Sequence, residues 1–226
     1  MLCIYVQSEF AAFRHFSAGS FRQTADFITP SAAYGLLLNA ANIEMRSYKS
    51  ELPMTAIKEN LPCFKMALGA RELPIKHSLF QQLHNYPVGS SGKEKKAGTK
   101  GSKYNIAPAR RAILSGIKGY ICIDENPDFE EQLKMGLEGK TKRGYGLPFL
   151  GDNSFLLDRF EITELPDKAY WFVRVIEKEK GMHAGDITRL SIKINREDMS
   201  KTETELFMPK HLEGNIPEEA WVEVGY

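Results

Sequence analysis

The chain has 226 residues, of which 42% are hydrophobic and 26% charged, and its formal net charge at pH 7 is +1. This composition is ordinary for a soluble globular protein with a real core, and it excludes a protein that binds nucleic acid through its overall charge. The N-terminal apolar stretch is too short for a signal peptide, and no run approaches the ~18 apolar residues of a spanning helix. We therefore expect a cytoplasmic protein without membrane contact.

The first third of the chain predicts a strand, a loop and a helix. Residues 2–7 are apolar or β-branched and indicate a buried strand. A polar loop with a glycine follows. Residues 31–44 then have the pattern of a helix, with Pro30 before it and Ser31 as the candidate N-cap.

The remaining pattern alternates strands with one further helix. Residues 126–139 predict a short helix that is capped by Asn126 or Asp128. A glycine-rich loop, residues 140–154, comes after it, and the C-terminus is polar. The predicted strands cover residues 63–69, 79–86 (for which a helix is the alternative), 112–124, 155–165, 169–178 and 187–194.

This order is that of a split βαβ, ferredoxin-like unit with an appended sheet, so we predict an α+β fold. The unit would span residues 1–165, and residues 166–226 would form a β-rich part packed on the same body.

A lysine-rich run lies inside the predicted unit, between two strands. From Lys93 to Arg111 there are seven basic residues and one acidic residue, a net charge of +6, so the other residues sum to −5. The run could be an inter-domain linker, a solubilising loop or a basic arm for a polyanion. Its position argues against the linker, and its one-sided charge favours phosphate contact over solubility. The candidate contacts are Lys93, Lys95, Lys96, Lys100, Lys103, Tyr104, Arg110 and Arg111.

Two other segments carry basic residues beside aromatic ones. The loop after the first strand holds Arg14 and Arg22 among phenylalanines, a combination that suits splayed single-stranded RNA, although the phenylalanines could simply cover the core. The glycine-rich loop holds Lys142, Arg143 and Tyr145, and its backbone N–H groups could bind an anion, although a plain glycine turn explains it equally well.

The sequence gives little support for catalysis. It contains no HExxH or CxxC motif and no GxSxG elbow, so we predict no metal, no cofactor and no catalytic residue. A metal-free ribonuclease would need only a base, an acid and a cation, which His77 or His84 could supply with Tyr104 and Lys103. The three cysteines stand in apolar surroundings and predict three reduced core thiols. They are Cys3, Cys63 and Cys122.

Two motifs resemble those of a known family. Residues Pro30, Ser31, Ala32, Gly35, Leu36 and Leu37 match the Pro-Ser-(Ala/Thr)-x-x-Gly-Leu-Leu helix start of CRISPR-associated RAMP proteins. The chain is most similar to their fifth Cas family, the subunit of type I Cascade complexes that caps the crRNA 5′ handle. The stretch Pro148–Arg159 resembles that family's LG(D/R)xxF segment, closest to its DevS-like, MYXAN-type branch.

The resemblance implies a modified RRM-like domain with a β-hairpin thumb, here about residues 86–111. It also implies partners: the crRNA 5′ handle, the backbone and large subunits of Cascade and, indirectly, target DNA. The leading hypothesis is therefore a non-catalytic RNA-binding subunit of a hetero-oligomer. An endoribonuclease that processes repeat RNA and a protein-interaction module without RNA contact remain as alternatives.

Overall fold

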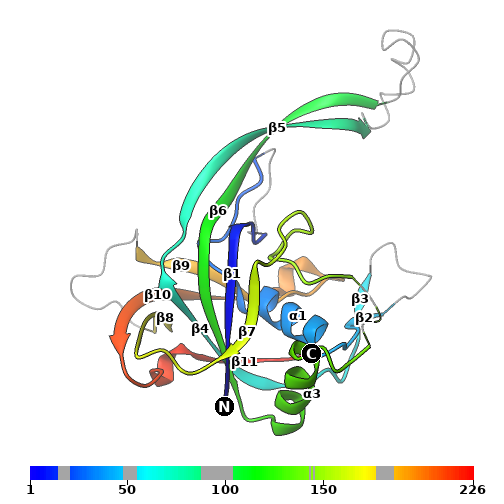
Figure 1. Cartoon of the computed structure of the whole chain (residues 1–226). Coiled ribbons are helices and arrows are strands. Elements are labelled where there is room, and N and C mark those ends of the chain that lie inside the picture. Colours follow the sequence, from blue (N-terminus) through cyan, green and yellow to red (C-terminus); the bar gives the residue numbers. More distant parts are fainter. Residues whose placement is uncertain (15–20, 48–54, 88–103, 143, 145, 177–185) are drawn as a thin grey trace.

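The computed structural model describes all residues except 15–20, 48–54, 88–103, 143, 145 and 177–185, and it describes only the backbone of residues 81–87 and 104–109. The chain has an α+β fold, as predicted (Figure 1). Its helices are α1 (Pro30–Ala40) and α3 (Pro127–Leu137). Its strands are β1 (Leu2–Ala11), β2 (Arg46–Ser47), β3 (Ala56–Ile57), β4 (Phe64–Glu72), β5 (Ile75–Pro87), β6 (Tyr104–Asp124), β7 (Arg159–Thr163), β8 (Lys168–Arg174), β9 (Thr188–Lys193), β10 (Glu203–Glu213) and β11 (Trp221–Val224).

One antiparallel sheet contains all the described strands except β2 and β3, which pair with each other. Its order is β7-β1-β6-β4-β8-β10-β9, with β11 paired to β4 and β5 paired to β6. The first four of these strands, together with α1 and α3, have the strand order of a ferredoxin-like unit. The C-terminal strands continue the same sheet, because β8 and β11 both bond to the free edge of β4. The sequence did not predict β10 or β11.

The main core lies between the sheet and the two helices. Alternate residues of β1, namely Leu2, Ile4 and Val6, point into it together with Leu37 and Leu38 of α1. A smaller cluster lies on the opposite face around Trp171, which is fully buried. Within the described ranges, neither helix has the length and apolarity that a membrane crossing requires.

The helix starts follow from their capping residues. Of the two predicted caps of α3, Asn126 is the one observed, and its side chain accepts a hydrogen bond from the Phe129 N–H at 3.0 Å. The predicted cap of α1 is wrong: Pro30 is the first helical residue, and the Thr29 hydroxyl accepts from the Ala32 N–H at 3.2 Å. Ser31 is already inside the helix, because proline is favoured at its first position, where no N–H is needed.

The prediction of three core thiols is also wrong. Cys3 and Cys122 are joined in a disulfide, and Cys63 is an exposed free cysteine. The physical reason is the sheet register: Cys3 of β1 stands directly opposite Cys122 of β6, with their Cα atoms 4.1 Å apart. Sequence spacing could not show that these two positions are paired.

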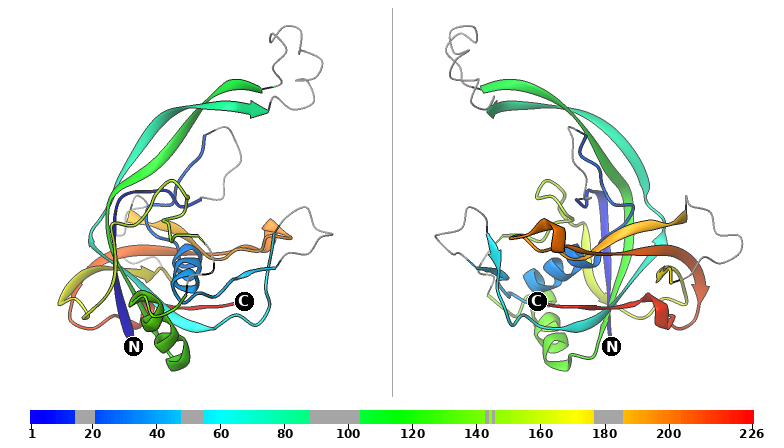
Figure 2. Two further views of the ribbon diagram at one scale, coloured as in Figure 1. Left: turned by 45° about the vertical axis from the view of Figure 1, so that its right-hand side comes forward. Right: turned by 180° about the vertical axis from the view of Figure 1, so that it is seen from behind.

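A long hairpin arm extends from the sheet. The arm consists of β5 and the first half of β6, paired from Ile75 and Ser115 to Pro87 and Tyr104. The second half of β6 lies between β1 and β4 in the body. Figures 1 and 2 show the arm curving away from the body. A hairpin is therefore present where the family resemblance implied an inserted thumb, and its pairing begins before residue 86 and ends after residue 111.

Candidate nucleic-acid interface

The base of the arm brings together segments that are distant in the sequence. β1 ends at Ala11, opposite Leu114 of β6. Beyond this point the loop that follows β1 pairs with β6 instead, through Arg22 and Arg111. Here the Arg22 N–H donates to the Arg110 carbonyl at 3.0 Å, and the Ala112 N–H donates to the Arg22 carbonyl at 2.8 Å. Backbone pairing thus sets Arg22 directly opposite Arg111, the neighbour of Arg110 in the sequence.

The same loop also positions Arg14. Arg14 pairs with Thr24, and the Thr24 hydroxyl accepts from the Phe13 N–H at 2.8 Å. Phe13 is buried and anchors the loop, whereas the arginine side chains remain exposed. Three predicted RNA-contacting residues, Arg14, Arg22 and Arg110, are therefore exposed cations on the loop after β1 and on the neighbouring part of β6. Exposed cations attract phosphate without requiring fixed geometry.

Arg111 has a different environment. Its side chain is only 12% exposed, its Nη2 lies 2.5 Å from Asp152 Oδ2, and its guanidinium lies 5.0 Å from the centre of the Phe155 ring. Burial alone would raise the pKa of Asp152, but hydrogen bonds from the Ser154 N–H and the Arg111 guanidinium outweigh it and hold that pKa below its usual range. The charge of Arg111 is therefore already compensated inside the protein.

The loop that holds Asp152 is fastened to the end of β1. The Ser8 hydroxyl donates to the Leu156 carbonyl at 2.9 Å, and the Ala12 N–H donates to the Leu150 carbonyl at 3.4 Å. Between these contacts Gly151 has a φ of +76°, and a Cβ there would come within 2.1 Å of the Ala12 carbonyl oxygen. Only glycine fits this turn.

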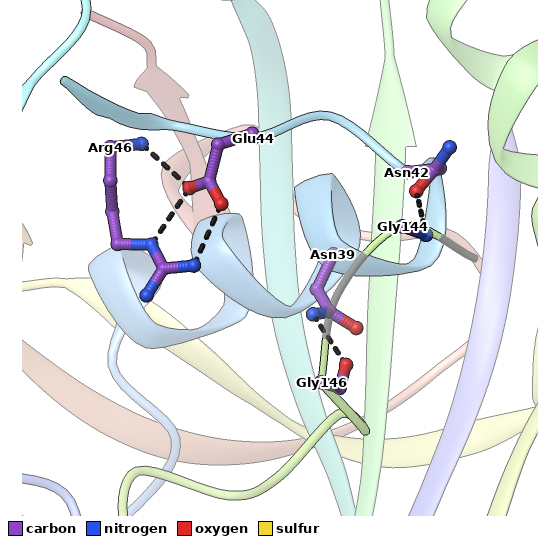
Figure 3. Close-up of polar contacts among 6 residues, drawn as sticks. All are labelled: Asn39, Asn42, Glu44, Arg46, Gly144 and Gly146. Atoms are coloured by element: carbon purple, nitrogen blue, oxygen red, sulfur yellow. Dashed lines mark hydrogen bonds and ion pairs between the residues drawn. The ribbon is translucent and has the colours of Figure 1, made fainter. Parts of the chain in front are cut away.

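The glycine-rich loop folds against the end of α1. Figure 3 shows the Gly144 N–H donating to Asn42 Oδ1 at 3.0 Å and Asn39 Nδ2 donating to the Gly146 carbonyl at 3.1 Å. The Gly144 N–H is therefore engaged within the protein, which favours the plain-turn interpretation over an anion site. Lys142 is exposed in this loop.

An ion pair also lies beside the end of α1. Arg46 binds both carboxylate oxygens of Glu44, at 2.8 and 2.7 Å (Figure 3). The hydrogen bond from the Arg46 side chain lowers the pKa of Glu44 to about 2. The cation of Arg46 is thus neutralised locally.

Several predicted contacts lie outside the described part of the chain. Tyr104 is described only by its backbone, which pairs with Pro87 at the far end of the described arm. The others are Lys93, Lys95, Lys96, Lys100, Lys103, Arg143 and Tyr145.

The nuclease candidates are only partly placed. His77 lies on the arm with its Nε2 2.7 Å from the Ser115 hydroxyl oxygen, whereas His84 is described only by its backbone. Across the described ranges, no three His, Cys, Asp or Glu side chains gather as metal ligands would. The predicted absence of a metal and of catalysis stays a prediction.

One further exposed residue lies in this region that the sequence pattern did not indicate. Phe80 is 66% exposed on β5, directly opposite Arg110. The available signal was that Ser78 and Gln82, the neighbours of Phe80 on the same face of a strand, are both polar.

Comparison with known proteins gives matches in structure alone. No family model and no curated protein matches the sequence. One solved chain, from a structure titled "CRISPR RNA-guided surveillance complex", superposes with a TM-score of 0.58 at 9% identity, over 97% of this chain and 92% of that one. The two chains share a fold. Another, titled "Crystal structure of Cas protein", matches at a TM-score of 0.48 and 12% identity, over 94% and 93% of the two chains.

Proposed function

We propose that this protein is a non-catalytic RNA-binding subunit of a type I CRISPR Cascade complex. It would cap the 5′ handle of the crRNA, contact the backbone and large subunits, and meet target DNA only through the complex. The observation that carries the proposal is a fold shared over nearly the whole length of both chains with a component of an RNA-guided surveillance complex. The motifs of residues 30–37 and 148–159 support it independently.

The arm base supplies a physical means of holding RNA. Arg14 and Arg22 are exposed on the loop after β1, which pairs with β6 through Arg22 and Arg111, and Arg110 is exposed on β6 next to this pairing. Arginines in this position neutralise phosphates and release counterions. Phosphate contacts set the path of the RNA and do not read its sequence, so selection of the handle requires base contacts as well.

Co-expression with a guide RNA and candidate partner subunits tests this proposal. The charge-reversed variant Arg14→Glu, Arg22→Glu, Arg110→Glu should lose the guide RNA, and the magnitude of its salt slope should fall by about 2, at ~0.7 per lost contact to a single strand. The matched control is Lys58→Glu, Lys168→Glu, Lys201→Glu, which changes net charge equally at exposed sites elsewhere. Equal RNA retention by both variants would contradict the proposal.

The lysine run is tested separately. Charge reversal at Lys95, Lys96, Lys100 and Lys103 should weaken RNA binding and its salt dependence if these residues are contacts. Unchanged affinity would favour the alternative of a protein-interaction module that the run only solubilises.

The ribonuclease alternative keeps one observation in its favour, the contact between His77 and the Ser115 hydroxyl. Purified protein should leave repeat RNA intact in EDTA. Specific cleavage that is lost in both His77→Ala and His84→Ala proteins would replace the non-catalytic proposal with an enzymatic one.

A further inference from the structure

The two faces of the arm follow from its register. β5 and β6 pair without a shift from Ile75–Ser115 to Leu83–Ala107, so directly opposite residues share a face. Leu114 is buried in the main core, and Ala112 and Arg110 lie on the same face by alternation. This core-side face of the arm also carries Lys76, Ser78 and Phe80.

The core-side face changes character along the arm. Next to the body, Leu114 and Ala112 of this face are buried, and Lys76 Nζ lies 2.7 Å from Asp26 Oδ1. Two residue pairs further out, Phe80 stands directly opposite Arg110, and both side chains are exposed. Among the residues whose side chains are described, no carboxylate pairs with the Arg110 guanidinium.

An exposed phenylalanine opposite an exposed arginine suits a nucleotide. A base can stack on an aromatic ring whatever its identity, and a guanidinium can bind the neighbouring phosphate or stack on a base. The Cβ atoms of directly opposite strand residues lie ~5 Å apart, so one nucleotide can touch both side chains.

We propose that Phe80 and Arg110 form a stacking site for one nucleobase of single-stranded RNA, with Arg110 on the adjacent phosphate. This inference rests on the proposed function, which makes RNA the ligand, and it adds the residue that contacts a base. Because stacking tolerates every base, the site should add affinity and fix the path of the strand along the arm without selecting its sequence.

The other face of the arm provides a matched control. It carries Ile75, 64% exposed, and Leu79, 40% exposed. The residue opposite Leu79 is Arg111, whose cation is bound to Asp152. Leu79 is therefore an exposed apolar residue next to Phe80 that has no aromatic ring and stands opposite a cation already bound to a carboxylate.

The test is fluorescence anisotropy of the full chain with a labelled oligoadenylate of about 12 nucleotides, and with an abasic strand of equal length. Phe80→Ala should lower affinity for oligoadenylate by about 5- to 100-fold and bring it close to the affinity for the abasic strand. Phe80→Trp should retain binding, and Leu79→Ala should leave it unchanged. Arg110→Ala should reduce the salt slope by about 0.7, whereas Phe80→Ala should leave the slope as it is.

The outcomes separate this inference from the function on which it rests. If the wild-type chain binds neither strand, the proposed function itself fails. If it binds oligoadenylate and Phe80→Ala binds equally well, or if Phe80→Trp does not retain binding, the stacking site is wrong and the RNA-binding function stands. If Phe80→Ala keeps its RNA affinity but no longer co-purifies with partner subunits, the face binds protein and the stacking site is overturned.

Discussion

Arg110 and Arg111 are neighbours in the sequence with opposite environments. Arg110 is exposed on the core-side face of the arm, whereas Arg111 points to the other face, toward Asp152 and Phe155. Strand alternation alone produces this difference. Both arginines were predicted from the sequence as RNA contacts. A count of basic residues cannot show which face of a strand each side chain occupies.

The Arg111–Asp152 pair should give a pH-dependent contribution to stability. The pKa of Asp152 is lowered in the folded state relative to an unfolded value near 3.9, so the stabilisation is complete above about pH 5 and is lost as the pH falls through the folded pKa. We expect Asp152→Asn to lower the free energy of unfolding by about 1–3 kcal/mol at pH 7.

Urea unfolding of the wild-type and Asp152→Asn proteins between pH 7 and pH 3 measures this effect. The difference between them should shrink toward pH 3. A difference that stays constant over this range would show that the carboxylate is not ionically coupled to Arg111.

Two glycines with positive φ allow a second comparison. Gly116, φ +71°, has open space where a Cβ would lie, whereas at Gly151 the Cβ would meet the Ala12 backbone. Gly116→Ala should cost about 1–2 kcal/mol through backbone conformation alone. Gly151→Ala should cost clearly more, since Ala12 must also move. Thermal unfolding ranks the two variants, and equal melting temperatures would contradict this ranking.

At the scale of the elements, the capping of α1 shows what sequence reasoning could and could not reach. Both Thr29 and Ser31 are good capping residues, and only the position of the first helical turn distinguishes them. Because Pro30 is the first helical residue, the residue before it, Thr29, is the N-cap. Strong apolar patterns predicted both helices and most strands of the body, with errors at their ends, but they did not predict β10 or β11.

Removal of the two hydroxyls should therefore have unequal effects. Thr29→Val should lower the free energy of unfolding by about 1 kcal/mol, because the Ala32 N–H loses its partner. Ser31→Ala should have a smaller effect, since the Ser31 hydroxyl bonds only to that of Thr29 among the described residues. Chemical denaturation measures the free energy of unfolding of both variants. A larger loss of stability in Ser31→Ala would show that Ser31, and not Thr29, caps the helix.

The arm was harder to delimit. All residues from Ile75 to Phe80 in the described part of β5 are exposed. Hydrophobic periodicity arises from burial, so an unburied hairpin gives a weak signal. The lysine run located the insertion, but it did not reveal that the pairing begins as early as Ile75 or that Phe80 stands beside Arg110.

At the scale of the whole molecule, the pairings between strands that are distant in the sequence could not be predicted. Strand and helix order gave the ferredoxin-like unit, because each element has its own local pattern. The continuation of the sheet from β4 to β8 and β11, and the meeting of Cys3 with Cys122, depend on contacts between residues a hundred or more positions apart. Nothing in the local pattern encodes these contacts.

The disulfide should stabilise the entire domain. It joins cysteines 119 positions apart, and such a closure restricts the unfolded chain. Reduction should lower the free energy of unfolding by about 2–4 kcal/mol. The double variant Cys3→Ala, Cys122→Ala should show no response to reductant. Alkylation of the denatured, unreduced chain should label Cys63 alone, and labelling of all three cysteines would contradict the disulfide.

The sharing of β6 between body and arm restricts how the length of the arm can change. A deletion of one residue from each strand between the body and Phe80 would turn every outer side chain to the opposite face. A deletion of two from each strand would keep the faces and shorten the reach by about 7 Å. The reach of the arm is therefore adjustable only in even steps, and any lineage that lengthens or shortens it must either move by pairs of residues or exchange what its two faces present.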